Sequence, residues 1–142
     1  MAEPTSIETV EEFDSFVAKH KYVVVDFWAE WCPPCKAMAP MFANLSKSHG
    51  REGQLAFAKI DVDKTPEVAK KYGITAMPSF LFLHDFGKAD GIDVPQDGKI
   101  AGGGTFMDNG KLKMIRGADP RNLTAVASEL GRRVKEAADT AA

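Results

Sequence analysis

An almost uninterrupted run of β-branched and aromatic residues, Tyr-Val-Val-Val-Asp-Phe-Trp-Ala at positions 22–29, restricts the fold of this chain more than any other feature. A strand with one solvated face would alternate apolar and polar residues, and this run does not. Its length and composition are typical of a central strand that is covered on both faces. The sequence therefore predicts a sheet with a layer of helices on each side.

Helical and strand-like segments alternate along the rest of the chain. Thr9 and Glu12 form a capping-box pattern that predicts a helix to about residue 20. The other predicted elements are a helix from Pro34 or Cys35 with Pro40 inside it, a strand at 55–62, a short helix that Thr65 caps and Gly73 ends, strands at 78–83 and 111–116, and a last helix from Pro120. This order predicts an α/β fold, a central mixed sheet with helices on both faces, in one domain of residues 1–142.

One segment, residues 84–105, shows no sustained period and contains six glycines. A structureless loop longer than ~12–15 residues is uncommon in a compact domain and usually has a function or is mobile. Four acids, Asp85, Asp90, Asp93 and Asp97, stand there among few apolar residues. We therefore expect a surface loop that the core does not need, because lengthening such a loop costs little closure entropy.

Charge and hydropathy exclude several classes of function. Eighteen basic and twenty acidic residues give a net charge of −2, without the basic excess of a nucleic-acid-binding protein. No apolar stretch approaches the ~20 residues of a membrane span. The first ten residues lack the basic start and apolar core of a secretory signal. A cytoplasmic protein without nucleic-acid or membrane partners is the resulting expectation.

The two cysteines, Cys32 and Cys35, lie where the predicted strand at 22–29 gives way to a helix. A helix N-terminus favours a thiolate, which is the attacking species in thiol–disulfide exchange. We expect Cys32 to be the exposed nucleophile and Cys35 the more buried resolving thiol. A zinc half-site and an inert buried pair are weaker alternatives, because zinc needs two further ligands that the sequence does not offer at ligand spacing.

Asp26 and Lys59 interrupt two apolar strand segments. A buried carboxyl has a raised pKa, so Asp26 is a candidate proton acceptor for the resolving thiol. Lys59 is a candidate neighbour that biases the ionisation of Asp26. The alternatives are an aspartate that faces solvent near the strand end, and a lysine whose stem is buried while its ammonium reaches water.

Four motifs in order resemble the thioredoxin family. They are Val-Asp-Phe-Trp-Ala-Glu-Trp-Cys-x-Pro-Cys-Lys at 25–36, Ala-Pro at 39–40, Lys-x-Asp-Val-Asp at 59–63, and Tyr-Gly-Ile-x-x-Met-Pro-Ser-Phe at 72–80. The match covers nearly the whole chain apart from residues 84–105 and the two ends. The resemblance implies a thioredoxin fold.

The resemblance also implies roles for individual residues. Cys32 is the attacking cysteine, Cys35 resolves, Asp26 is the buried acid and Lys59 is its neighbour. Pro78 matches a cis-proline that leaves the backbone of Met77 free to pair with an extended substrate. The implied substrate-binding surface consists of Trp31, Pro33, Pro34, Met77, Pro78, Gly117 and Ala118. Trp28 would pack beneath the cysteines, although Trp28 and Met77 are also plausible core fillers.

Two features depart from the family pattern. Pro33 stands where glycine is usual, and we expect it to influence the redox potential because proline fixes φ and removes a backbone donor. The segment 84–105 is inserted between two strands that usually form a short hairpin. The family pattern places its anchors at the sheet end away from the cysteines, so we expect it to affect partner choice or oligomerisation, or to be a neutral insertion.

The function that follows is that of a protein-disulfide reductase that keeps protein thiols reduced. No cofactor or metal is expected on the chain itself. The resemblance implies that NADPH supplies electrons through a flavin-dependent thioredoxin reductase. We expect the protein to be a monomer that acts on disulfide-containing proteins. The alternatives are a disulfide oxidant or isomerase, and a binding module on the same scaffold for which redox chemistry is secondary.

Overall fold

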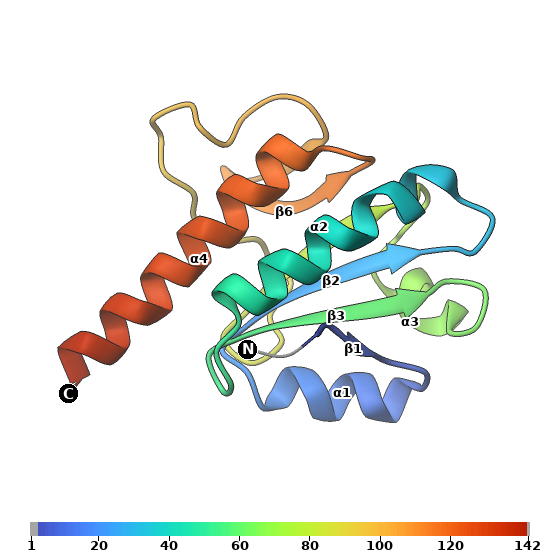
Figure 1. Ribbon diagram of the computed structural model, residues 1–142, viewed down its shortest axis with the longest axis horizontal. Coiled ribbons are helices and arrows are strands. Elements are labelled where there is room, and N and C mark those ends of the chain that lie inside the picture. The colour runs from blue at the N-terminus through green and yellow to red at the C-terminus, as the bar shows by residue number, and fades with distance from the viewer. Residues whose placement is uncertain (1–2, 142) are drawn as a thin grey trace.

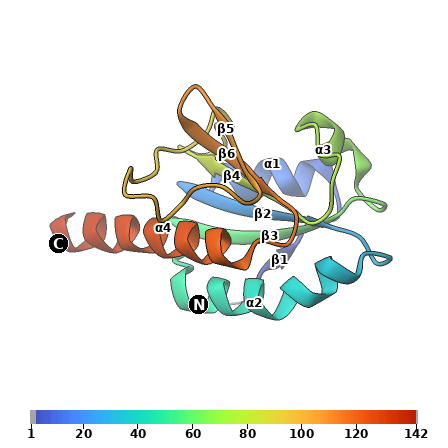
Figure 2. The same cartoon turned by 90° about the horizontal axis from the view of Figure 1, so that it is seen from above.

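The computed structural model describes residues 3–141, which form a sheet between two layers of helices (Figures 1 and 2). The elements in chain order are β1 (Thr5–Ser6), α1 (Val10–Ala18), β2 (Tyr22–Trp28), α2 (Pro33–His49), β3 (Leu55–Asp61), α3 (Pro66–Lys71), β4 (Ser79–His84), β5 (Thr105–Asp108), β6 (Lys111–Arg116) and α4 (Pro120–Ala141). The strand order is β1-β3-β2-β4-β6-β5. The predicted α/β fold with a mixed sheet and helices on both faces is confirmed.

The predicted central strand, β2, lies in the interior of the sheet. It is parallel to β3 and antiparallel to β4, and its residues from Val23 to Phe27 are buried. Two separate cores explain this burial. On one face Val24 packs in a cluster with residues of α2 and α4, and on the other Val25 packs with residues of α1 and α3. Figure 2 shows these helix pairs on opposite sides of the sheet.

The two predicted helix starts behave differently. Thr9 caps α1 as expected, because its Oγ1 accepts the N–H of Glu12 at 3.0 Å while Glu12 accepts the N–H of Glu8 at 3.1 Å. Thr65 precedes α3 but makes no side-chain cap. Its hydroxyl donates instead to the carbonyl of Glu8 at 3.1 Å, which ties the start of α3 to the segment before α1.

The segment 84–105 is not a surface loop that the core can do without. Ile92, Val94 and Ile100 are each less than 10% exposed and join the core cluster under α4. The last residue of the segment, Thr105, begins β5, a strand that the sequence did not reveal. A hairpin connects β5 to β6 through Asn109 and Gly110, whose φ values of 51° and 77° are typical of a type I′ turn.

The insertion also reaches both ends of the sheet. Near its start, His84 pairs with Lys88, and Ile92 exchanges two backbone hydrogen bonds with Leu112. Near its end, Gly104 accepts the N–H of Arg116 at 2.8 Å. Because β6 runs antiparallel to β4, Arg116 lies beside Ser79, next to Pro78. The expectation that the insertion stays away from the cysteine end is therefore wrong for its last residues.

Polar side chains of α4 explain why the last residues of the insertion lie near the cysteine end of the sheet. Arg121 donates to the carbonyls of Lys99 and Ala101 at 3.0 and 2.6 Å. The buried amide of Asn122 donates to the carbonyls of Ala101 and Gly102 and accepts the N–H of Ala101. These bonds satisfy backbone groups that an irregular segment would otherwise leave unpaired. They hold the insertion along the first turns of α4.

Candidate active site

Cys32 and Cys35 form a disulfide at the junction of β2 and α2, with their Cα atoms 5.3 Å apart. Both residues are 3% exposed, so the expected difference in exposure between the two is absent in the disulfide form. The reason is that Ala29 and the partly buried Trp28, Val62 and Met77 pack around both cysteines.

Cys32 is the N-cap residue of α2, which begins at Pro33, earlier than the sequence predicted. Pro33 and Pro34 have no N–H, so the first backbone donor of the helix is that of Cys35. It donates to the Sγ of Cys32 at 3.2 Å. A donor and the positive end of a 17-residue helix therefore face the sulfur, and both stabilise negative charge on it.

The peptide bond between Met77 and Pro78 is cis, and it faces the cysteines. The Sγ of Cys32 lies 3.6 Å from the carbonyl oxygen of Met77. Pro78 is held on its other side, because its carbonyl accepts the N–H of Gly117 at 2.7 Å. This bond brings the segment after β6, with the exposed Ala118, beside the cis-proline.

Trp31 is the most exposed large apolar residue among those described, at 63%. Its indole nitrogen donates to the Oδ2 of Asp63 at 2.9 Å, which fixes the ring next to Cys32. The backbone N–H of Asp63 in turn bonds the carboxylate of Asp61 at 2.9 Å. This role of Asp63 was not predicted from the sequence, although the residue ends the Lys-x-Asp-Val-Asp motif that could have indicated it.

Asp26 is 1% exposed, which rules out the solvent-facing alternative. Its Oδ1 has no hydrogen-bond partner. Burial is the main cause that raises its pKa to about 7, and the positive charge of Lys59 opposes the shift. Side chains alternate along a strand, so Asp26 shares a sheet face with Val24, the face that α2 covers.

Lys59 lies opposite Asp26 in the register of β2 and β3, so both side chains point to the same face. The Nζ of Lys59 is 4.8 Å from the centre of the Trp28 ring. A cation–π contact of this kind holds the ammonium near the buried carboxyl while the residue remains partly exposed. The side chain is therefore both anchored and solvent-accessible, as the two interpretations of Lys59 separately required.

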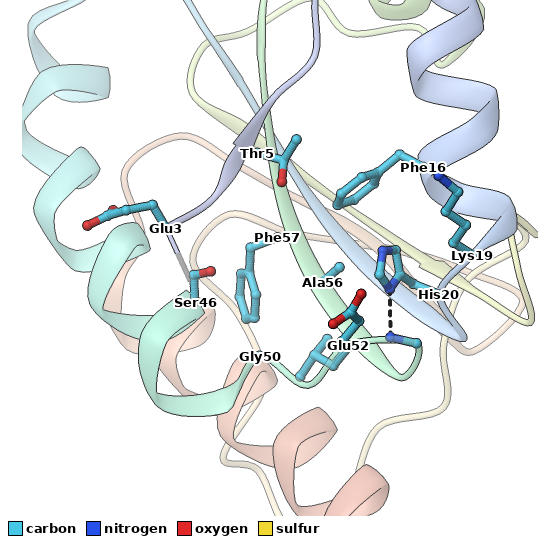
Figure 3. A pocket seen from close by; sticks show the side chains of 12 residues that line it. Glu3, Thr5, Phe16, Lys19, His20, Ser46, Gly50, Glu52, Ala56 and Phe57 are labelled. Atoms are coloured by element: carbon cyan, nitrogen blue, oxygen red, sulfur yellow. Dashed lines mark hydrogen bonds between the residues drawn. The ribbon is translucent and has the colours of Figure 1, made fainter. Parts of the chain in front are cut away.

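A hollow of about 580 Å³ lies at the opposite end of the sheet (Figure 3). Phe16, His20 and Phe57 line it, and the Nδ1 of His20 accepts the N–H of Gly53 at 3.0 Å. Burial lowers the pKa of His20, which favours its neutral form. Because the hollow opens at the start of β3, it does not belong to the cysteine site.

Two other kinds of site are absent from residues 3–141. No three side chains of the His, Cys, Asp or Glu type gather there in a way that could hold a metal ion. None of the helices in that range is long and apolar enough to cross a membrane.

Comparison with known proteins agrees with this geometry. The family model described as Thioredoxin matches residues 4–101. The chain belongs to the thioredoxin family. Thioredoxin of Neurospora crassa is 40% identical over 135 residues, which cover 95% of this chain and 92% of that protein. A thioredoxin-like protein of Fusarium culmorum is 42% identical over 125 residues, 88% of each chain.

Solved structures show the same relationship. The crystal structure of Malassezia sympodialis thioredoxin superimposes with a TM-score of 0.69 at 30% identity, covering 92% of this chain and 93% of the other. As a member of this family with a Cys-x-x-Cys pair at disulfide distance, this chain is a thiol–disulfide oxidoreductase that reduces protein disulfides. The family match also extends into the insertion, because the matched residues end at Ala101.

Proposed function

We propose that Cys32 attacks the substrate disulfide and that Cys35 resolves the intermediate. The Cys32 thiolate forms a mixed disulfide and displaces one substrate sulfur as a thiolate. The Cys35 thiolate then attacks the Sγ of Cys32, and the second substrate sulfur leaves. Two electrons pass to the substrate, and the Cys32–Cys35 disulfide remains. The observation that carries this assignment is the N-cap position of Cys32, whose sulfur faces the Cys35 N–H.

In this proposal Asp26 accepts the proton of Cys35. A base works best when its pKa is near the working pH, and a pKa of about 7 meets that condition. The Oδ1 of Asp26 has no hydrogen-bond partner, so it can take up a proton or accept a hydrogen bond from a water. Lys59 adjusts the equilibrium, because its positive charge favours the ionised carboxyl.

The proposed substrate-binding surface lies around the disulfide. An extended peptide would pair with the backbone of Met77, beside the cis Met77–Pro78 bond. Trp31 offers an exposed ring on one side of Cys32, and Gly117 and Ala118 lie beside Pro78 on the other. Pro33 and Pro34 complete an apolar rim that has no N–H groups to satisfy.

Regeneration and location complete the proposal. A flavin-dependent thioredoxin reductase would restore the dithiol with electrons from NADPH, as is expected of a family that carries no redox cofactor of its own. We place the reaction in the cytoplasm and expect a monomer. The cysteine content supports the location, since both cysteines belong to the exchange motif and none is used as a structural staple.

Reduction of insulin disulfides and trapping of intermediates test this assignment together. Cys35→Ser should accumulate mixed disulfides through Cys32, because attack survives while resolution is lost. Cys32→Ser should accumulate none, and neither variant should reduce insulin. Equal trapping by both variants would overturn the roles. Binding of the same partners by the double variant Cys32→Ser/Cys35→Ser would favour the alternative of a binding module.

A further inference from the structure

The short strand β5, which begins where the insertion ends, supplies an aromatic ring to an arginine at the end of β6. The guanidinium carbon of Arg116 lies 4.1 Å from the centre of the Phe106 ring. Phe106 pairs with Met114, two residues before Arg116, so the two side chains share one face of the hairpin. Stacking on a ring fixes the plane of a guanidinium while leaving its edges free to donate hydrogen bonds.

This guanidinium has no anionic partner. Every salt bridge within residues 3–141 joins other side chains, and Arg116 is exposed. Arg132 and Arg133, by contrast, are both paired with Glu129. An arginine that is held in place and unpaired retains its full capacity for a carboxylate, which it binds with two parallel hydrogen bonds.

The backbone of Arg116 lies next to the cysteine site. Arg116 pairs with Ser79, and the following residue, Gly117, bonds the carbonyl of Pro78. The Met77 carbonyl touches the Sγ of Cys32. Ser79 is ~6–7 Å along the chain from Met77, and the next strand lies ~5 Å to the side. The two separations combine to about 8–9 Å, which an extended substrate of about three residues spans.

The support under Arg116 is rigid. Its backbone N–H donates to the carbonyl of Gly104, and the N–H of Gly104 donates to Asp119, each at 2.8 Å. No side chain fits at Gly104, because a Cβ there would lie 2.1 Å from the Arg116 carbonyl oxygen. The insertion therefore packs directly against the backbone that carries the arginine.

We propose that Arg116 determines substrate specificity by binding an acidic side chain close to the target disulfide, and that Phe106 positions its guanidinium. The proposal rests on the reductase function and adds the class of substrate, proteins with a carboxylate within a few residues of the reactive cysteine. A side chain that is already ordered loses little entropy on binding, so a single pair is enough to discriminate. The strand β5, which follows the insertion, thus takes part in substrate choice through the ring that it contributes.

The test uses disulfide peptides that differ at one position. Glu, Gln or Lys is placed in turn at each of the four positions on either side of one cysteine, and kcat and KM are measured at low and high salt. At the position nearest Arg116, we expect kcat/KM for Glu to exceed that for Gln about three- to tenfold, mainly through KM. High salt should reduce the ratio, because the pair is solvent-exposed.

Substitutions distinguish the role of Arg116 from that of Phe106. Arg116→Gln should abolish the preference for Glu and leave kcat for the Gln peptide unchanged. Phe106→Leu should weaken the preference, and Phe106→Tyr, which keeps the ring, should restore it. Arg51→Gln is the matched control, because it removes an exposed arginine beside the start of β3, at the far end of the sheet. It should leave the preference intact.

Two results overturn the inference. One is a wild-type protein that reduces the Glu and Gln peptides equally at every position, and the other is an Arg116→Gln variant that keeps the preference. Failure of the reductase function is distinguishable from both, because no peptide of the set would then be reduced.

Discussion

Asp119 accepts the backbone N–H of Gly104 at 2.8 Å and so joins the inserted segment to the first turn of α4. The same carboxylate accepts the backbone N–H of Asn122 at 3.2 Å and its side-chain amide at 2.7 Å. Burial works against the charged form, but these hydrogen bonds outweigh it and lower the pKa of Asp119. One side chain thus caps a helix and fixes the insertion.

Asp119→Ala should therefore destabilise the protein by about 1–3 kcal/mol, because it removes a helix cap and leaves the Gly104 N–H unpaired. Denaturant unfolding near pH 7 measures this loss. Asp14→Ala, an exposed aspartate within α1, is the control and should cost less than ~0.5 kcal/mol. A carboxyl with a lowered pKa stabilises only while ionised, so the loss should shrink as the pH falls below ~4. A loss that is independent of pH contradicts the capping role.

Asp26→Asn should stabilise the oxidised protein increasingly as the pH rises from ~4 to 7. The folded protein holds the Asp26 proton up to about pH 7, whereas the unfolded chain releases it near the ordinary value of 3.8. Between these values the unfolded state binds fewer protons, so wild-type stability falls with pH, by roughly 4 kcal/mol in total. Asp26→Asn has no ionisable group at this position, so its stability does not fall with pH in this way.

The difference in unfolding free energy between Asp26→Asn and wild type is measured at several pH values. Use of the disulfide form keeps cysteine ionisation out of the comparison. Asp14→Asn, at an exposed position of α1, is measured in parallel as the control. If the Asp26→Asn difference does not change with pH, the carboxyl is not protonated in the native state at neutral pH, and its proposed role as a base loses its support.

Ile100→Ala should cost about 2–4 kcal/mol, because Ile100 is 7% exposed and packs in the core under α4. Phe86→Ala, in the same insertion but 54% exposed, should cost less than about 1 kcal/mol. Thermal and denaturant unfolding compare the two. If both substitutions lower the free energy of unfolding by the same small amount, the insertion is a surface loop that the core does not need.

Gly104→Ala should cost more than about 2 kcal/mol, since the added Cβ would collide with the backbone of Arg116 rather than with a flexible side chain. Gly98→Ala tests a different effect in the same insertion. Nothing lies within 4 Å of its Cβ position, but its φ is +82°, so it should cost only about 1 kcal/mol. Unfolding free energies that reverse this order would show that the segment at 104 can move.

The sequence predicted the elements that carry strong local patterns. The apolar run of β2 does not fit a strand with one face in solvent. Thr9 and Glu12 form the capping-box pattern that marks the start of a helix. The cysteine pair was found for the same reason, because its chemistry is local and its place between β2 and α2 follows from the neighbouring patterns. The burial of Asp26 was predictable because it interrupts a strand that has no exposed face.

The insertion was harder to predict, because its structure depends on distant residues. Ile92, Val94 and Ile100 stand singly among glycines and aspartates, so no period marks them as core. The partners that order them, Arg121 and Asn122, look like ordinary polar residues of a helix. The strands β1 and β5 were missed because they are short and are recruited by pairing to longer neighbours.

Those two short strands determine how the sheet ends. β1 has two residues and β5 has four, and the register of β5 shifts between Phe106 and Met107. Each covers a longer strand whose open backbone groups could otherwise recruit a strand from another molecule. A short or bulged outer strand offers only a few such groups in line. At high concentration, both borders of the sheet therefore resist the edge-to-edge association that begins β-aggregation.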